Sequence, residues 1–560
     1  MIQPQAFEAL ASSTNGIAKL RELILDLAVH GLLVPQDTDD EPATVQLKKI
    51  AAEKEQLFKE GKIKKQQPPP TIDTADLPFL LPVGWEWVYL SETLALVTDG
   101  DHQPPPKAEC GIPFLVIGNL NKARINLNNC RYVPNEYYQA LDWGRQPLKS
   151  DLLYTVTGSY GMPIAVDIDD PFCVQRHVAI LKTTESSPHR YLLSLLGSHY
   201  AFDYATKIAT GIAQKTVPLT GLRKMPIPLP PEQEQLRIIK KIDELMALCD
   251  QLDQHQNHSN TIHQRLLQTL LESLTQSTDN EAFQQIWAQI SAHFDTLFTT
   301  ESSVDQLKQV ILQLAVMGKL VEQEPNDEHA SVLLEKINAE KQRLTKEGKI
   351  KKQQVLPEIH EEERLFVLPS GWIWVRLGAT GYSTTGKTPI TANSDLYGNE
   401  IPFIGPGQIT PQGKIIDPEK WLSEKGRNQT TIAKLGDILM VCIGGSIGKS
   451  AIAHKELAFN QQINCVTAVC LDNRYLHIAM NGPHFQKAII VSATGSATPI
   501  INKSRWDELL IPLPPLAEKH RIVAKVDELM TICDLLKIRI RKSQNFQENL
   551  ATSIIETNTT

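Results

Sequence analysis

The sequence of 560 residues lacks the features that mark membrane and exported proteins. No uninterrupted apolar segment approaches the roughly 18 residues that a membrane-spanning helix requires. The start of the chain lacks a basic stretch followed by an apolar run. The eight cysteines form no Cys-x-x-Cys pair, and Cys249 and Cys533 hold equivalent positions on matching segments, where we expect thiols that pack as small hydrophobic groups. We therefore expect a cytoplasmic protein.

An excess of positive charge is also missing. The chain has 56 Lys and Arg against 64 Asp and Glu, a formal net charge of −8. A protein that binds nucleic acid alone through a broad basic face needs clustered Lys and Arg, so a DNA-binding role would require partners that share the electrostatic work. One basic run, Lys59 to Lys65, recurs as Lys346 to Lys352. It is either a phosphate contact or the solvated end of a helix that stops at Gly61 and at Gly348.

Residue groups that carry catalysis are scarce. The chain contains no Asn/Asp-Pro-Pro-aromatic tetrapeptide of the kind that a DNA methyltransferase places near its flipped base. Metal-dependent nuclease chemistry needs grouped carboxylates, and Asp167, Asp169 and Asp170 are typical of a turn. The histidines are scattered along the chain. We expect no catalytic residue, no metal site and no cofactor.

What the sequence does contain is a long internal repeat. Ala52 to Gln67 recurs as Ala339 to Gln354 with three differences, at an offset of 354 − 67 = 287. Two neighbouring pairs keep that offset, and a fourth pair, Ile227 to Leu252 and Ile511 to Leu536, has an offset of 511 − 227 = 284. A repeat of this length is a duplicated domain and not a solenoid unit. The neighbouring pairs are Leu20 to Gln36 with Leu307 to Gln323, and Leu81 to Leu90 with Leu368 to Leu377.

Each copy reads as helices, then a head of short strands, then a long helix. In the first copy, apolar spacing predicts a helical pair over residues 17–61, with a turn near residues 31–40. Strands are predicted near residues 87–90, 114–118, 152–156 and 178–181, followed by a helix over residues 190–207. From Pro231 to Gln276 there is no Gly or further Pro. That segment predicts either one helix of about 45 residues and roughly 65 Å, or two helices broken near residues 256–260.

The order of segments predicts an α+β protein with two similar heads separated by long antiparallel helices. We expect the outbound helix from Glu232 to pack antiparallel against the inbound helix from Val304. The helices near Leu20 and Leu529 would pair in the same way if the termini meet, which gives a pseudo-two-fold ring. The predicted boundaries are residues 1–80 for a helical region, 81–230 for the first head, 231–367 for a helical spacer, 368–514 for the second head and 515–560 for a final helical region.

The ordered motifs resemble the specificity subunits of type I restriction and modification systems. They are the LPxGW motif before each head, the GSxG turns at residues 158–161 and 445–448, the Thr-Gly pairs at residues 210–211 and 494–495, and the IPLPP segment before each outbound helix. The second head also has GKTP at residues 386–389 and GSIGKSAI at residues 445–452. The first head departs from this pattern at Asp99 to His102 and at Met162, which fits two heads that read different sequences.

The resemblance implies a non-catalytic subunit that reads a bipartite DNA target, one half-site per head. It also implies that the helices set the gap between half-sites and seat two adenine-methyltransferase subunits, which translocase and nuclease subunits join. Amide, hydroxyl and cationic side chains on loops match base edges. The candidates in the first head are His102, Gln103, Asn119, Asn121, Arg124, Tyr160, Gln175, Arg176 and His177. In the second head they are Lys387, Thr388, Gln408, Thr410, Ser446, Lys449, Asn460, Gln461, Gln462 and Asn464.

The rival reading is an enzyme, either a P-loop ATPase or a DNA methyltransferase. Gly381 to Thr388 (GYSTTGKT) matches the P-loop pattern letter for letter. A working P-loop needs a helix whose N-terminus holds phosphate, but Pro389 follows at once and residues 390–400 have no helical periodicity. A third possibility is a helical adaptor that binds only proteins, which would not shift DNA when assembled.

Overall fold

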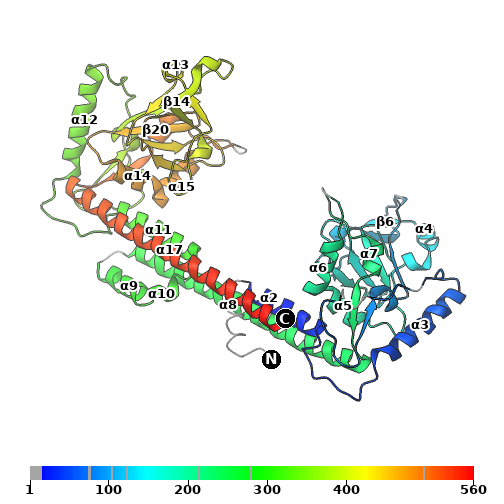
Figure 1. Ribbon diagram of the computed structural model, residues 1–560. Helices are drawn as coiled ribbons and strands as arrows, with labels where there is room; N and C mark the ends of the chain where they lie inside the picture. The colour runs from blue at the N-terminus through cyan, green and yellow to red at the C-terminus, as the bar shows by residue number, and fades with distance from the viewer. Residues whose placement is uncertain are drawn as a thin grey trace. The chain divides into compact units, whose positions relative to one another are not determined.

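The structure is a computed structural model that describes residues 15–67, 69–72, 77–102, 105–121, 124–211, 214–277, 280–495 and 498–559 (Figure 1). The chain divides into two compact units. Unit 1 is Met1–Ser259 with Ser543–Thr560, and unit 2 is Asn260–Lys542. Two helices contribute residues to both units: α8 (Glu232–Gln276) and α17 (Leu516–Thr559). No helix of the described ranges is both long enough and apolar enough to span a membrane.

The long outbound segment is a single helix, α8, with no break near residues 256–260. The predicted helical pair at the start of unit 1 is α2 (Gly16–Val29) and α3 (Ala43–Lys59). Leu20 and Leu23 of α2 are buried, as the apolar spacing predicts, and Cys249 of α8 is buried in the same core. Cys533 is buried in unit 2, so both thiols are core residues.

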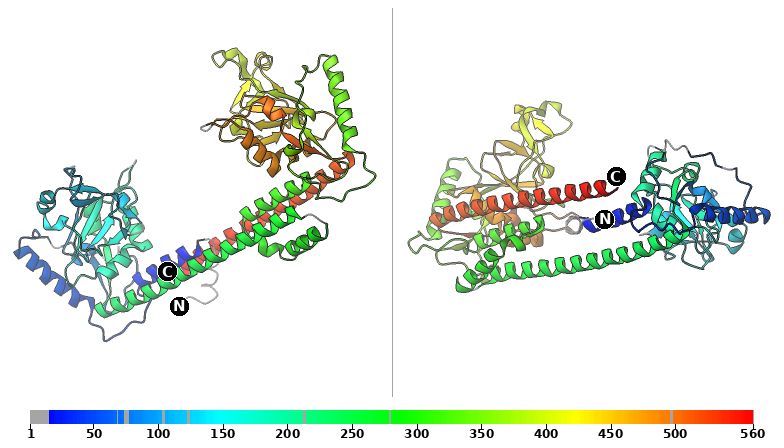
Figure 2. Two further views of the ribbon diagram at one scale, coloured as in Figure 1. Left: turned by 180° about the vertical axis from the view of Figure 1, so that it is seen from behind. Right: turned by 60° about the horizontal axis from the view of Figure 1, so that its bottom comes forward.

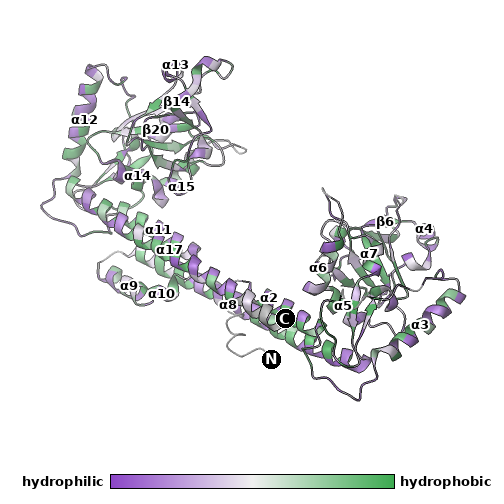
Figure 3. Cartoon of the chain, viewed as in Figure 1, coloured by the Kyte–Doolittle hydropathy of each residue, from purple (hydrophilic) through white to green (hydrophobic). Residues whose placement is uncertain are grey.

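The head of unit 1 is built on a four-stranded antiparallel sheet in the order β2-β10-β7-β8. Its central strands are buried along their whole length, and Figure 3 shows the sheet regions rich in hydrophobic residues. The strands of the sheet are β2 (Leu96–Asp99), β7 (Leu152–Thr155), β8 (Pro163–Ala165) and β10 (Val178–Lys182). The others are β1 (Glu86–Tyr89), β3 (Ile112–Leu115), β4 (Leu120–Asn121), β5 (Arg124–Ile125), β6 (Arg131–Val133), β9 (Cys173–Val174) and β11 (Pro226–Leu229).

The helix predicted over residues 190–207 is two helices, α5 (His189–Leu196) and α6 (His199–Ile208). The break has a local cause, because Ser198 is the N-cap of α6 and its hydroxyl accepts a hydrogen bond from the backbone N–H of Ala201 at 3.4 Å. The remaining helices of this head are α4 (Asn135–Gln139) and α7 (Leu219–Arg223).

The head of unit 2 repeats this plan with the sheet order β13-β20-β17-β18. A second sheet has the order β15-β14-β19-β16. The strands are β12 (Ile373–Arg376), β13 (Gly381–Thr385), β14 (Tyr397–Ile404), β15 (Lys420–Leu422), β16 (Ile432–Ala433), β17 (Ile438–Val441), β18 (Ser450–Ile452), β19 (Leu457–Phe459), β20 (Ile463–Ala468) and β21 (Leu510–Leu513). The helices of unit 2 are α9 (Asn280–Ala292), α10 (Phe294–Leu297), α11 (Glu301–Val316), α12 (Ala330–Lys346), α13 (Glu424–Arg427), α14 (Asn473–Asn481), α15 (Pro483–Ser492) and α16 (Lys503–Asp507).

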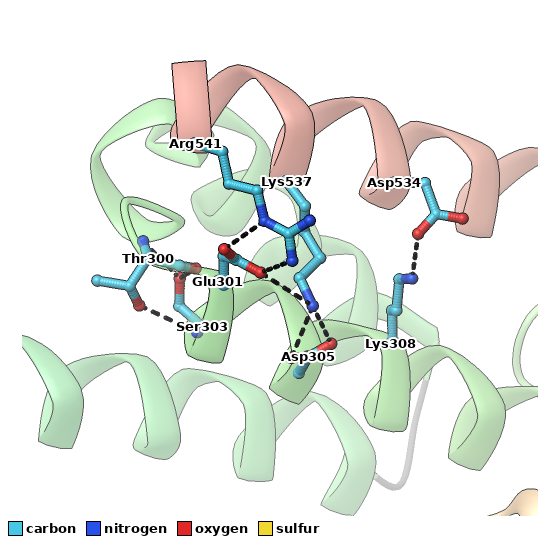
Figure 4. Close-up of polar contacts among 8 residues, drawn as sticks. All are labelled: Thr300, Glu301, Ser303, Asp305, Lys308, Asp534, Lys537 and Arg541. Atoms are coloured by element: carbon cyan, nitrogen blue, oxygen red, sulfur yellow. Dashed lines mark hydrogen bonds and ion pairs between the residues drawn. The ribbon is translucent and has the colours of Figure 1, made fainter. Parts of the chain in front are cut away.

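Antiparallel helix pairs form as expected, but the partners differ from the prediction. In unit 2, α11 packs antiparallel against α17, the outbound helix of its own copy. Three ion pairs show the direction: Glu301 with Arg541 at 2.6 Å, Asp305 with Lys537 at 2.8 Å, and Lys308 with Asp534 at 2.5 Å (Figure 4). In unit 1, Arg21 of α2 pairs in the equivalent way with Asp250 and Asp253 of α8, at 2.6 and 2.7 Å.

The predicted antiparallel packing of α8 against α11 is wrong. His263 Nε2 lies 3.0 Å from the carbonyl oxygen of Leu297, and Lys319 Nζ donates to the carbonyl oxygen of Thr275 at 2.9 Å. Leu297 and Lys319 flank α11 and contact α8 in the same order along the chain, the first at His263 and the second at Thr275. The second half of α8 and α11 therefore run parallel. Helices α9 and α10 precede α11 and bring the chain back before it begins. The physical reason is that β12 pairs with β21. The chain therefore enters and leaves the head at neighbouring positions, which brings α11 beside α17, the helix that follows β21.

The two terminal helices meet, although the antiparallel partner of α2 is α8 and not the predicted α17. The last residues of α17 belong to unit 1. Lys19 Nζ of α2 donates to the carbonyl oxygen of Glu548 at 3.2 Å and to the hydroxyl of Thr552 at 2.9 Å. Figure 2 shows the N-terminal helix beside the end of α17 in both views. The first described helix, α2, therefore lies beside the last part of α17 within unit 1.

The LPxGW motif locks each head to its outbound helix. The indole N–H of Trp85 donates to Glu234 Oε2 at 2.9 Å, and Gln36 donates to the other oxygen of Glu234 at 2.8 Å. Unit 2 repeats both bonds, with Trp372 and Gln323 on Glu518 at 2.8 and 2.6 Å. Burial raises the pKa of both carboxyl groups above their usual range. The start of each outbound helix is thus anchored by a buried, hydrogen-bonded acid.

Candidate nucleic-acid interface

One end of the four-stranded sheet collects most of the predicted reading residues in each head. In unit 1, β2 and β7 end there and β10 and β8 begin there, as the pairs Ala179 with Asp99 and Val178 with Thr155 show. In unit 2, β13 and β17 end and β20 and β18 begin at the corresponding place. We call this end of the sheet the reading end. It gathers loops that are more than 70 residues apart in sequence, including residues 100–102 and 175–177.

A glycine at the reading end lets two backbone segments cross in each head. A Cβ atom at Gly100 would lie 1.8 Å from the carbonyl oxygen of Val174, and one at Gly386 would lie 2.1 Å from that of Asn460. Real Cβ atoms do not approach so closely. The two glycines are therefore equivalent, so Asp101 of the first head corresponds to Lys387 of the second, and His102 corresponds to Thr388. The sequence singled out the flanking residues but not the reason for the glycine.

In unit 2, the crossing brings five predicted residues together. Thr388 donates from its hydroxyl to Gln461 Oε1 at 2.6 Å, and Asn460 donates to Gln462 Oε1 at 3.0 Å. The amine of the exposed Lys387 has no partner among the residues described. The cluster therefore offers a free ammonium group and a set of ordered amide groups, which is the chemistry that reads base edges in a groove.

In unit 1 the same place is differently charged. Asp101 accepts from the Tyr137 hydroxyl at 2.9 Å and from Arg145 at 3.2 Å, so it is held within the head. His102 is exposed and pairs with Asp99 at 3.1 Å. Gln175 contacts His177 Nδ1 at 2.9 Å. Burial, together with the neighbouring Arg176, lowers the pKa of His177, so its ring is neutral near pH 7. The sequence missed that Asp101 is anchored, because Tyr137 and Arg145 are distant along the chain.

The GSxG turns and the Thr-Gly segments adjoin at the same end. The backbone N–H of Gly158 donates to the carbonyl oxygen of Lys215 at 3.1 Å, and that of Gly444 donates to Pro499 at 2.9 Å. Ser446 and Lys449 lie in the turn of unit 2, where the N–H of Lys449 donates to the carbonyl oxygen of Ser446 at 3.2 Å. Lys215, which is exposed, was not among the sequence candidates. Its position next to the Thr-Gly pair is the only sequence signal for it.

Several candidates are held by structural bonds instead of facing solvent. Asn119 is buried and accepts from the N–H of Val116 at 3.1 Å, and Gln408 accepts in the same way from Gly405 at 3.0 Å. Asn464 is buried on β20 and accepts from the Thr385 hydroxyl at 2.8 Å. Asn119 and Gln408 thus close short helical turns after equivalent strands, a role that polar loop residues often have.

The remaining candidates are placed as follows. Tyr160 stacks on Phe202, with ring centroids 5.8 Å apart. The hydroxyl of Thr410 accepts from the N–H of Lys414 at 3.1 Å within a turn. Arg124 is exposed on β5, whose strand pair follows the first head's short helical turn. Gln103 and the side chain of Asn121 lie outside the described residues.

The P-loop match does not form a phosphate-binding loop. Residues 381–385 of the pattern are strand β13. The next two backbone N–H groups are already used, because Gly386 donates to Ile463 and Lys387 donates to Phe459, both at 3.0 Å. The following segment contains the short turn Ser394–Leu396 and no α-helix before α13 within the described chain. The groups that would cradle a phosphate are therefore engaged elsewhere.

The crossing glycine gives a test of the reading end. We expect Gly386→Ala to destabilise unit 2 by about 1–3 kcal/mol, because the new methyl group overlaps backbone atoms that cannot move independently. Gly407→Ala is the matched control. A Cβ at Gly407 meets nothing within 4 Å, so the change should stay within about 0.5 kcal/mol. Urea unfolding of the full chain measures both values. Equal stability of the two variants would contradict the close approach at Gly386.

Comparisons with known proteins match both a part of the chain and nearly its whole length. Residues 369–543 match the family described as Type I restriction modification DNA specificity domain. The chain is 35% identical to the Type I restriction enzyme EcoEI specificity subunit and 36% identical to the EcoAI specificity subunit, both from Escherichia coli. Each match covers 97% of this chain and 93% of the relative.

One solved structure shares the fold. It is described as "Structural basis underlying complex assembly and conformational transition of the type I R-M system", with a TM-score of 0.52 at 18% identity. The match covers 86% of this chain and 99% of the other.

Proposed function

The chain belongs to the specificity subunits of type I restriction-modification systems, and we propose that each of its heads reads one half of a bipartite DNA target at its reading end. Subunits of this family supply DNA specificity and no catalysis. The observation that carries the proposal is that two heads of one plan present different side chains at one place, with anchored Asp101 in unit 1 and free Lys387 in unit 2 among the described residues.

We assign the first recognition domain to residues 81–230 and the second to residues 368–514. The remaining ranges, 1–80, 231–367 and 515–560, are helical regions that carry partner subunits. The reading residues proposed are those with exposed, cationic or amide ends at the reading end, with Lys387, Gln461 and Arg176 as the foremost. Asn119, Gln408 and Asn464 are assigned to support of the loops instead, because their polar groups are engaged within the head.

The partner assignment rests on exposed apolar side chains of the outbound helices. Leu248 of α8 and the equivalent Ile532 of α17 are 52% and 45% exposed. The same offset, 284, relates Ile262 and Leu266 to Phe546 and Leu550, all of them at least 40% exposed: 53% and 51%, then 68% and 40%. Each outbound helix thus presents one matched set. Matched apolar surfaces fit two copies of one protein, and we assign them to two methyltransferase subunits, with translocase and nuclease subunits joining the complex.

Lys387→Ala tests the reading end against the P-loop reading. We expect the assembled complex to lose about 1–3 kcal/mol of affinity for its DNA target, as for one specific contact, while ATP-driven translocation by bound complex keeps its rate. Lys336→Ala on α12, a similarly exposed lysine with a 52% exposed side chain, is the control and should change neither quantity. Fluorescence anisotropy measures the affinity. Lost ATPase activity with unchanged DNA affinity would argue instead for a nucleotide site.

A further inference from the structure

The stretch KEGKIKKQQ occurs twice without a single difference, as residues 59–67 after α3 and residues 346–354 after α12. We call these stretches the basic arms. All four lysines of each arm are exposed. Exposed positions tolerate substitution within about 0.5 kcal/mol, so packing does not require nine identical residues. The loops at the reading ends differ between the heads, whereas the arms do not.

Helix termination explains only the first part of each arm. Gly61 and Gly348 have φ angles of +72° and +67° and end α3 and α12. The last helical residues, Lys59 and Lys346, oppose the negative end of the helix dipole. Lys64 and Lys65, with their counterparts Lys351 and Lys352, lie beyond that stop. Within the described chain, their amines have no hydrogen-bond or ion-pair partner.

The arms lie at the opposite end of each head from the reading end. Lys54 of α3 donates to the carbonyl oxygen of Ser91 at 2.8 Å, and Gln66 of the arm donates to that of Ala95 at 3.0 Å, just before β2 begins. Lys341 of α12 makes the equivalent bond to Gly378 at 2.7 Å. The four residues of β2 separate this end from Gly100 by about 13 Å. DNA held at the reading end is therefore not the nearest ligand for the arms.

A groove beside the arm of unit 1 has the lining of a peptide site. It has a volume of about 300 Å³, and its lining includes apolar Leu47, Phe58 and Ile63, the cations Lys54, Lys64 and Lys65, and the carboxylates Glu55 and Glu92. Phe58 is 38% exposed. Apolar walls next to free ammonium groups suit a segment that carries both an apolar side chain and carboxylates. Each arm has four lysines and one glutamate, whereas the chain as a whole has a formal charge of −8.

We propose that the basic arms are twin docking sites for an acidic segment of the methyltransferase subunit, one copy per arm. This inference rests on the proposed function, because that subunit is the partner assigned two places in the complex. Two arms of identical sequence suit two identical partners, although Thr345 replaces Phe58 beside the arm of unit 2, and free ammonium groups pair with carboxylates. The arms then extend the apolar contacts of the outbound helices and fix the position of each methyltransferase against its head.

Charge reversal in the assembled complex tests this assignment. The variants are Lys64→Glu with Lys65→Glu in unit 1, Lys351→Glu with Lys352→Glu in unit 2, and all four changes together. Each is co-expressed with the methyltransferase subunit, and native mass spectrometry with titration counts the bound copies. We expect two copies on the wild-type chain. In each double variant, one of the two copies should bind at least about ten-fold more weakly, a change of about 1.4 kcal/mol. In the fourfold variant, both copies should weaken.

The repeat itself provides the matched control. Lys48 is exposed on α3, and its counterpart on α12 is Glu335 at the same offset of 287. Lys48→Glu therefore introduces the charge that the second repeat already carries at this position. Both methyltransferase subunits should still bind this variant. Circular dichroism of each purified variant confirms folding before binding is compared.

Two outcomes would overturn the assignment. If the fourfold variant bound both methyltransferase copies fully, the arms would be solvated helix ends and not docking sites. The second outcome is full methyltransferase binding together with weaker DNA affinity. If the logarithmic salt slope of DNA binding also became shallower by about 0.9 for each phosphate that the variant no longer neutralises, the arms would be assigned to DNA. The proposed function is checked separately, because the wild-type complex must bind and methylate a bipartite site in the same preparation whatever the arms do.

Discussion

Exchanging residues 90–225 for the head of another type I specificity subunit changes one half of the recognised target and leaves the other half intact. The boundaries follow the structure. Trp85 and its bond to Glu234 stay with the helices, as do both strands of the β1 and β11 pair. The exchanged segment contains every unit 1 residue of the reading end. Because the core clusters of this head and its helices contain only residues of unit 1, the new head folds without help from unit 2.

The reciprocal exchange uses residues 377–509 of unit 2, which are equivalent by the two offsets. It should change only the other half-site. Sequencing of methylated sites in cells that carry each chimaera, together with its partner subunits, identifies both halves in one measurement. A chimaera that alters both half-sites at once would show that the heads do not read independently.

Lengthening the helices that join the two units should lengthen the gap between half-sites. The chain passes between the units at Ser259 to Asn260 in α8 and at Lys542 to Ser543 in α17. One heptad inserted at both places adds about two helical turns and about 10 Å at 1.5 Å per residue. B-DNA rises about 3.4 Å per base pair along each strand. We expect the preferred gap to grow by about three base pairs while both half-sites keep their sequences.

Binding to the longer site should also be weaker, because three base pairs turn the groove by about a quarter of a helical turn. A selection from random gap lengths measures the preferred spacing directly. The control is the same heptad inserted between Pro325 and Asn326, in the exposed loop between α11 and α12, which keeps Gln323 on Glu518 and should leave the gap unchanged. If the doubly inserted chain still selects only the original spacing, α8 and α17 do not set the gap.

Much of the fold could be predicted from the sequence, because the repeat exposes it. Offsets of 287 and 284 identify two similar modules, and local patterns predicted α2, α3, α8 and the strands β1, β3, β7 and β10. Helix pairing could not be predicted in this way. The sequence of α11 contains apolar faces for both α8 and α17, and only the strand pair β12 and β21 decides that the outbound helix of the same copy is the antiparallel partner.

The candidate site could be predicted only in part. Loop composition identified Lys387, Gln461 and His177, which lie at the reading end. It could not separate them from Asn119 and Gln408, since an amide that closes a turn has the same composition as one that faces DNA. The crossing glycines, Gly100 and Gly386, act through a contact with a segment that lies more than 70 residues away. Such proximity has no local sequence signal.

The most direct measurement of the central claim is the methylation pattern of a genome in a host that carries this chain with its methyltransferase partner. If each head reads one half-site, sequencing will find methylated adenines in a single bipartite motif. That motif will have two specific parts separated by a gap of fixed length and unspecified sequence. Exchange of residues 90–225 will replace only one of these parts. A continuous motif without a gap, or methylation that does not depend on this chain, would contradict the account.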